Sequence, residues 1–311
     1  MDDMLLTVTL LLAASLRIAT PLALAGIGEA ISEKSGVLNI GLEAIMLMGA
    51  FFSFIVTFFT GNLVLGLFAG MAAGVLVSMV HALFSINFKV DQTIVGLALN
   101  FTVLGLTSFL FLIVFGGAAM LPSIPTFQAV SIPVLSQIPV IGLVFFYQNI
   151  FVYITLISIV LVSVVFYKTE WGVNLLAVGE HPQAADTVGI NVFATRYLAC
   201  MLNGIFGGMA GSYFTLARLG FFMENITTGR GFIALVTVIL GRRNPVGIFI
   251  AAMVIGFSEA LQFNLQTMGF PVPSQVFIMF PYVVAVLVLL FSIGKSTNPS
   301  ALGVPYERSK R

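Results

Sequence analysis

Residues 168–196 read KTEWGVNLLAVGEHPQAADTVGINVFATR, the only long polar and charged run that lies between two apolar stretches long enough to cross a bilayer. The centre of this run predicts one short helix. Pro182 suits the first helical position, Ala184 and Ala185 favour a helical interior, and Gly189 suits the turn after the last residue. We therefore expect a helical knob that projects from an otherwise apolar protein.

The predicted knob carries apolar and polar side chains in an arrangement that fits the groove of another protein. Its apolar spine comprises Ala184, Ala185, Val188 and Ile190. The polar side chains beside the spine are Glu180, Gln183 and Asp186. The alternative is a solvated connecting loop with a single helical turn, which is a common feature of surface loops.

The composition of the whole chain assigns it to the integral membrane proteins. Hydrophobic residues make up 59% and charged residues 8%, and the mean hydropathy is +1.11. Soluble domains carry roughly 25% charged residues. The net charge is +1 and the cations are scattered, so the sequence does not indicate a nucleic-acid partner. The single cysteine, Cys200, excludes an intrachain disulfide framework and offers no metal-binding pair.

Apolar stretches of about 20 residues predict membrane-spanning helices. Nine candidates cover roughly residues 5–27, 37–59, 63–84, 93–115, 150–167, 197–219, 231–240, 246–265 and 276–293, within a range of eight to ten spans. The stretch 231–240 is too short to cross alone, so we expect a half-helix or the core of a longer span that begins near Ile226. The fold class is therefore an all-α, polytopic transmembrane helical bundle, one domain over residues 1–311.

The distribution of Lys and Arg predicts the orientation. With residues 168–196 in the cytoplasm, the same side receives Lys34, Lys89, Lys168, Arg196, Arg242, Arg243, Lys295, Arg308, Lys310 and Arg311. The opposite side keeps Arg218 and Arg230. We expect the N-terminus outside, with no cleaved signal peptide because no basic region precedes the first apolar run, and the basic tail 294–311 in the cytoplasm.

A faint internal duplication relates the two halves of the chain. The first set begins at Gly36 and continues through the span 63–84 and the turn at Lys89. The second set has segments of similar length in the same order, and it begins at Gly231 and continues through the span 246–265 and the turn at Pro271. The two sets begin on opposite sides in the predicted topology, which gives the inverted repeat typical of transporters. The alternative is chance similarity between apolar segments.

Glycines at four-residue spacing predict close helix packing. They are Gly66, Gly70 and Gly74, the pair Gly204 and Gly208, and the pair Gly207 and Gly211.

Polar residues at membrane depth predict a lined cavity or buried pairs, because an ionisable group there costs at least ~2.5 kcal/mol. They are Arg17, Asn39, Glu43, His81, Asn100, Asn203, Glu259, Gln262 and Asn264. Asn39 and Glu43 lie one helical turn apart, and Gly36 and Gly41 are able to break the helix around them. Such a break presents backbone dipoles to a polar solute. The alternative is a structural pair, such as Arg17 with Glu43, that holds two helices together.

The sequence contains no recognisable catalytic constellation. The run Gly294-Lys295-Ser296 imitates the end of a phosphate-binding loop, but the glycine that the motif needs at position 289 is Leu289. The chain offers no paired carboxylates in a polar domain and no metal cluster. We therefore expect no enzymatic activity, no catalytic residue, no cofactor and no metal site in this chain.

Three segments resemble ABC-importer permeases, most closely the nucleoside and simple-sugar branch that is related to the ribose and branched-chain amino acid permeases. They are EKSGVLNIGLE at 33–43, LAVGEHPQAADTVGINV at 176–192 and GRGFIALVTVILGRRNPVG at 229–247. The resemblance covers nearly the whole chain. In the family's coupling pattern a glutamate stands where this chain has Gln183, and many relatives carry an arginine where it has Leu176.

The resemblance implies a permease subunit of the bacterial plasma membrane whose segment 168–196 seats on a dimer of ATPase subunits, which bind the ATP. Its coupling residues would be Glu180, Pro182, Gln183, Ala184, Ala185, Asp186 and Gly189. It also implies a second permease chain, similar or identical, and a solute-binding lipoprotein or periplasmic protein that docks at the outer face. The entrance and docking residues would be Arg218, Glu224, Asn225 and Arg230, and the path would be lined by Asn39, Glu43 and Asn100.

The expected substrate is a small neutral molecule, for which a nucleoside is the first candidate and a simple sugar such as ribose the alternative. A different class remains open, an ion-coupled secondary transporter in which Glu43 or Glu259 is the coupling site. A membrane scaffold without transport is the third class.

Overall fold

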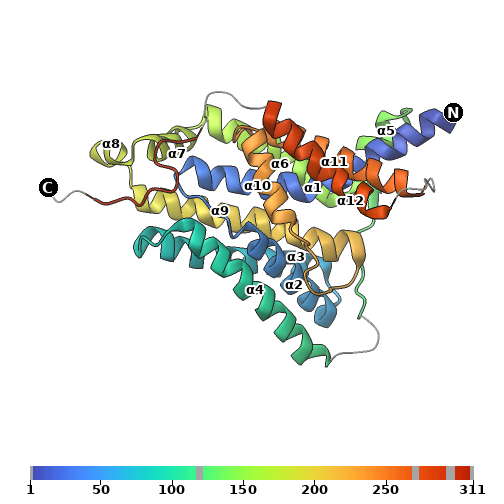
Figure 1. Cartoon of the computed structure of the whole chain (residues 1–311), viewed down its shortest axis with the longest axis horizontal. Coiled ribbons are helices and arrows are strands. Elements are labelled where there is room, and N and C mark those ends of the chain that lie inside the picture. Colours follow the sequence, from blue (N-terminus) through green and yellow to red (C-terminus); the bar gives the residue numbers. More distant parts are fainter. Residues whose placement is uncertain (1–2, 117–121, 268–272, 292–297, 309–311) are drawn as a thin grey trace.

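The described part of the chain folds into helices joined mostly by short turns, with one small two-stranded sheet (Figure 1). The computed structural model describes residues 3–116, 122–267, 273–291 and 298–308. The α-helices are α1 (Asp3–Lys34), α2 (Leu42–Thr60), α3 (Leu63–Ala82), α4 (Gln92–Phe115), α5 (Ile141–Phe145), α6 (Ile150–Lys168), α7 (Glu170–Glu180), α8 (Pro182–Thr187), α9 (Val192–Tyr213), α10 (Arg230–Leu240), α11 (Pro245–Thr267) and α12 (Ser274–Phe291). The other elements are the π-helical turns η1 (Leu83–Asn87) and η3 (Phe214–Leu219), the 3-10 turn η2 (Leu135–Gln137) and the antiparallel strands β1 (Ala129–Ser131) and β2 (Tyr147–Asn149).

Six helices of the described chain are long and apolar enough to cross a membrane. They are Met4–Lys34, Leu42–Thr60, Leu63–Asn87, Gln92–Phe115, Ile150–Lys168 and Pro245–Thr267. Helices α10 and α12 are apolar but shorter, and α9 adds 22 residues. The predicted all-α, polytopic fold is therefore confirmed, whereas the number of nine spans stays a prediction.

Several helix boundaries differ from the prediction, among them the start of α9, which is Val192 rather than residue 197. Helix α1 continues past Ile27 to Lys34, because the side chains of its last turns are buried inside the bundle rather than solvated. The second span begins only at Leu42, since the preceding residues 35–41 are not helical. Helix α10 has 11 residues, which confirms the half-helix, and the longer span that would begin near Ile226 is wrong.

Glycines allow the central helices to approach closely, as predicted. Helices α1 and α9 run through the middle of the molecule, and α4 lies at its margin (Figure 1). A Cβ atom built on Gly74 of α3 would lie 2.3 Å from the carbonyl oxygen of Gly204 in α9. A Cβ on Gly49 of α2 would lie 2.4 Å from the carbonyl oxygen of Gly208. Any larger residue would force these backbones apart.

The polar segments gather at one end of the bundle. Figure 1 shows α7, α8 and the described C-terminal segment 298–308 together at that end, and α5 with the start of α1 at the other. The two ends of the described chain therefore lie on opposite ends of the bundle. The assignment of the α8 end to the cytoplasm stays a prediction.

The predicted inverted repeat stays a prediction as well. The segments proposed to correspond differ locally, because residues 36–38 are not helical whereas residues 231–233 belong to α10. The turn at Pro271 lies outside the described residues. The described residues also exclude the run 294–296 and the predicted cytoplasmic cations Lys295, Lys310 and Arg311. The side chain of Leu289 is not described either.

Candidate functional site

The predicted knob is present as helix α8, and local chemistry explains both of its ends. Pro182 occupies the first turn, where its missing N–H leaves no hydrogen bond unmade. Gly189 follows the helix with a φ of +92°, a conformation that glycine adopts without a steric penalty. The preceding helix α7 is capped by Thr169, whose hydroxyl accepts a hydrogen bond from the N–H of Gly172 at 3.2 Å.

The expected apolar spine is divided between two faces of α8. Ala185 is 3% exposed and packs against Val178 of α7, Val192 of α9 and Tyr306 of the C-terminal segment. Val188, by contrast, is 77% exposed. Ala185 therefore holds α8 to its own chain. The outward face consists of Gln183, Ala184, Thr187 and Val188. The role of the knob in docking stays a prediction.

The two acidic residues of the knob contact the C-terminal segment 298–308. Glu180 accepts hydrogen bonds from the N–H and the hydroxyl of Ser300, at 3.2 and 2.8 Å. Asp186 pairs with Arg308 at 3.2 Å. The tail therefore forms a strap along the knob, and the predicted docking residues Glu180 and Asp186 are engaged by it.

The strap also makes hydrogen bonds to other elements at the same end of the bundle. The N–H of Ala301 donates to the carbonyl of Gly179 at 2.9 Å, and Arg196 of α9 donates to the carbonyl of Val304 at 3.2 Å. The ammonium of Lys89 hydrogen-bonds to Glu307 and holds the pKa of that exposed carboxyl below its usual range. The strap thus connects α7, α8, α9 and the turn before α4.

The break before α2 lies where Gly36 and Gly41 predicted it. The N–H of Asn39 donates to Glu29 of α1 at 2.8 Å, and its side-chain oxygen accepts from the N–H of Gly41 at 2.9 Å. Asn100 of α4 bridges the same break, because it accepts from the N–H of Ala44 and donates to the carbonyl of Ile40. The two asparagines therefore satisfy backbone groups that an unwound segment inside a membrane would otherwise leave unpaired.

Glu43 at the start of α2 holds the first turn of the half-helix α10. Its two carboxylate oxygens accept from the hydroxyl of Thr227 at 2.5 Å and from the N–H groups of Gly229 and Gly231 at 2.8 and 2.6 Å. The suggested pair of Glu43 with Arg17 is wrong, because Arg17 donates to Gln148 instead. A carboxylate at this end of α10 also faces the positive end of its helix dipole.

The other end of α10 is held by a buried ion pair. Arg243, in the turn after α10, donates to the carboxylate of Glu33 in α1, and both side chains are buried. The predicted place of Arg243 on the cytoplasmic side stays a prediction, and the ion pair shows only that its side chain is buried. The half-helix is thus fixed by charged groups from α2 at one end and α1 at the other.

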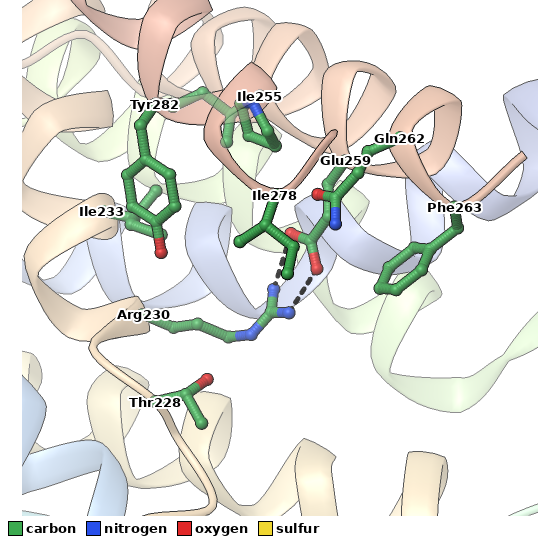
Figure 2. Close-up of a pocket in the computed structure, with 10 residues that line it drawn as sticks. Thr228, Arg230, Ile233, Ile255, Glu259, Gln262, Phe263, Ile278 and Tyr282 are labelled. Atoms are coloured by element: carbon green, nitrogen blue, oxygen red, sulfur yellow. Dashed lines mark hydrogen bonds and ion pairs between the residues drawn. The ribbon is translucent and has the colours of Figure 1, made fainter. Parts of the chain in front are cut away.

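A cavity lies beside α10, between α11 and α12, and contains the ion pair of Arg230 and Glu259 (Figure 2). The guanidinium of Arg230 faces both carboxylate oxygens of Glu259, with one N···O distance of 2.9 Å. Figure 2 shows the aromatic rings of Tyr282 and Phe263 on either side of the pair. The volume of this part of the cavity is about 150 Å³.

The four residues expected at the outer entrance do not form one cluster of contacts. Arg230 belongs to the cavity just described. Glu224 is exposed and accepts a hydrogen bond from Ser108 of α4 at 2.9 Å. Asn225 is exposed in a turn with a φ of +53°, and Arg218 is exposed at the end of η3. The role of these residues in docking stays a prediction.

Sequence reasoning missed several residues that hold these sites. Glu29 is fully buried, and its carboxylate accepts a hydrogen bond from the side-chain amide of Asn203 in α9 at 2.7 Å. The same carboxylate accepts from the N–H of Asn39 in the break before α2. Glu29 and Glu33 are one helical turn apart, and like charges at this spacing disfavour a helix, so no local signal in the sequence indicated that the first span continues beyond Ile27. Glu259 and Gln262 were recognised as polar residues at membrane depth but not as neighbours of Arg230.

Comparison with known proteins gives a family match over most of the chain. The family model described as "Branched-chain amino acid transport system / permease component" matches residues 11–291. No solved structure gives a significant match to the chain.

Three relatives cover nearly the full length of this chain. The guanosine ABC transporter permease protein NupQ of Bacillus subtilis is 37% identical over 318 residues, 99% of this chain and 100% of the relative. The nucleoside ABC transporter permease protein NupC of Lactococcus lactis is 36% identical over 313 residues, 98% of each chain. A Haloferax volcanii protein named "Putative glucose ABC transporter permease protein TsgC13" is 34% identical over 325 residues, 96% of this chain and 97% of the relative.

Proposed function

This chain belongs to the family of branched-chain amino acid transport system permease components, and from that premise we propose that it is the membrane-spanning subunit of an ATP-driven nucleoside importer. The observation that carries the substrate is the full-length similarity to a guanosine permease and to a nucleoside permease. The location is the bacterial plasma membrane, which accords with the apolar helices.

The outward face of α8 is the proposed contact with the ATPase. Its residues Gln183, Ala184, Thr187 and Val188 are exposed, and a short helix face of mixed apolar and polar side chains is able to fit a groove in a partner. The α8 end then lies in the cytoplasm and the start of α1 outside. Because each chain offers one such knob, two ATPase subunits require two permease chains. We favour a second, similar permease as the partner.

The substrate path is proposed to run beside the half-helix α10. Asn39, Glu43 and Asn100 stay the proposed lining of that path. Their hydrogen bonds to backbone groups also fix the break before α2 and the first turn of α10. Arg218, Glu224 and Asn225 remain the proposed contacts of a solute-binding protein at the outer face. ATP binds to the ATPase subunit, and no cofactor of this chain is proposed.

The deciding experiment is uptake by proteoliposomes that contain the permease pair, the ATPase and the binding protein. We expect labelled guanosine to accumulate only when ATP is supplied. Uptake by the permease alone under an ion gradient would contradict the proposal and favour a secondary transporter.

A simple sugar is the second candidate substrate, because the name of the Haloferax relative specifies glucose. The same proteoliposomes separate the two candidates when unlabelled guanosine, ribose and glucose compete with the labelled nucleoside. Competition by guanosine alone supports a nucleoside importer. Uptake of labelled glucose or ribose without uptake of guanosine would replace the nucleoside by a sugar.

A further inference from the structure

The cavity beside α10 has a polar half and an apolar half. The polar half contains the pair of Arg230 and Glu259 together with the amide of Gln262 (Figure 2). The adjoining apolar half has a volume of about 330 Å³, and Phe232 and Ala285 contribute to its lining. The two halves share lining residues from the turn before α10 and from all three helices: Thr228, Ile233, Ile255, Pro281 and Tyr282.

The ion pair retains hydrogen-bonding capacity after its own two bonds are made. A guanidinium has about five N–H donors and a carboxylate about four acceptor positions. The pair of Arg230 with Glu259 uses two of each. The side chains are 12% and 10% exposed and both line the cavity, so the pair is largely shielded from open solvent and borders the cavity. Adjacent donors and acceptors of this kind suit a vicinal diol, whose hydroxyls both donate and accept.

We propose that this two-part cavity is the nucleoside recognition site, with the ribose diol on Arg230 and Glu259 and the base in the apolar half against Tyr282. The inference rests on the proposed function and assigns the substrate to named residues. A nucleoside matches both halves, because its sugar is a polyol and its base is planar and apolar on its faces. Aromatic side chains bind such faces by stacking, and apolar pockets with a few polar groups fix the orientation of a ligand. A sugar alone would leave the apolar half unfilled.

The first test fills the apolar half without touching the ion pair. Ala285→Phe places a ring in the lining, whereas Val283→Phe places the same ring on the exposed face of α12 and serves as the matched control. In the reconstituted importer we expect Ala285→Phe to lower guanosine uptake at least about tenfold, a change of about 1.4 kcal/mol. ATP hydrolysis should persist in both variants. Equal uptake by both variants, or loss of ATP hydrolysis in Ala285→Phe, would overturn the assignment.

The second test concerns the ribose diol and measures the ratio of guanosine uptake to 2′-deoxyguanosine uptake. General misfolding lowers both rates and leaves this ratio unchanged. Glu259→Gln keeps the shape of the side chain but removes the charge that anchors Arg230. We expect wild-type uptake to favour guanosine over 2′-deoxyguanosine, and Glu259→Gln to lower that preference by about tenfold or more, because a site that binds a hydroxyl discriminates against the analogue without it. An unchanged ratio would overturn the diol contact.

The failure of this inference differs from the failure of the proposed function. If the wild-type importer transports guanosine and both tests give unchanged values, only the position of the recognition site is wrong. If the wild-type importer carries a sugar and no nucleoside, the proposed function is wrong, and the base assignment fails with it.

Discussion

Glu43 caps a helix to which it does not belong. An ordinary capping side chain lies next to the first turn in sequence, whereas Glu43 reaches residues 227–231 from helix α2. The carboxylate accepts three hydrogen bonds and is largely buried. Its removal would leave several donors without a partner inside the bundle, and each such group costs about 1–3 kcal/mol.

We expect Glu43→Ala to destabilise the permease by at least about 1–3 kcal/mol and Glu43→Gln to destabilise it less, because the amide retains one acceptor oxygen. The measurement is the midpoint of thermal unfolding of the detergent-solubilised protein. Glu224→Ala is the control, since this exposed carboxylate makes one side-chain contact. A melting temperature of Glu43→Ala equal to that of Glu224→Ala would contradict the capping role.

Helix α8 is an element with two faces that serve different purposes. The inward face is built on Ala185, which packs between α7, α9 and the strap. The outward face carries Ala184, which is exposed. A substitution of Ala185 therefore tests the packing of the fold, whereas a substitution of Ala184 tests the contact with the partner.

We expect Ala184→Arg to abolish ATP-dependent uptake and co-purification of the ATPase while the melting temperature of the permease stays unchanged. Ala185→Arg should lower the melting temperature itself, because a buried alanine site has no room for an arginine and no partner for its charge. The measurements are pull-down with the ATPase and thermal unfolding. Normal uptake by Ala184→Arg would show that the outward face of α8 is not the coupling surface.

At the scale of the whole molecule, close packing of glycine-bearing helices holds the bundle together. Lipid is as apolar as the helix surfaces, so association depends on backbone contact and buried polar bonds rather than on the hydrophobic effect. The contact of α3 with α9 illustrates this, since a Cβ on Gly204 would lie 2.5 Å from the Cα of Val75. Helix α4 differs, because its apolar side chains mostly face outward.

We expect Gly204→Leu to destabilise the bundle by at least about 1–3 kcal/mol, the usual cost of overpacking. Gly105→Leu in α4 is the matched control, because a Cβ there meets no atom within 4 Å among the described residues. It should leave the stability within about 0.5 kcal/mol of the wild type. Thermal unfolding of both variants in one detergent makes the comparison. Equal destabilisation would contradict the packing argument.

The orientation of the whole molecule is testable by cysteine labelling. The native Cys200 is fully buried, so it should react little with a membrane-impermeant maleimide. We expect Val188→Cys to be labelled in inside-out vesicles only and Glu224→Cys in right-side-out vesicles only. Labelling of Val188→Cys from outside would reverse the topology and remove α8 from reach of a cytoplasmic ATPase.

The sequence alone determined the features that depend on composition and on near neighbours. The excess of apolar residues predicted a helical membrane bundle, because unpaired backbone groups are too costly in lipid. Pro182 and Gly189 predicted the ends of α8, and Gly36 and Gly41 predicted the break before α2, since backbone preferences act within a few residues. The short apolar run at 231–240 predicted the half-helix by its length.

Only the tertiary structure decided which distant groups meet. Glu43 caps α10 rather than pairing with Arg17, and Asp186 contacts Arg308 of the strap. Nothing near Ala185 in the sequence indicates that it faces inward while Ala184 faces out, because that depends on where α9 and the tail pack. Buried polar groups take whichever partner the packing brings within hydrogen-bond distance, and that choice is made by contacts far apart in the chain.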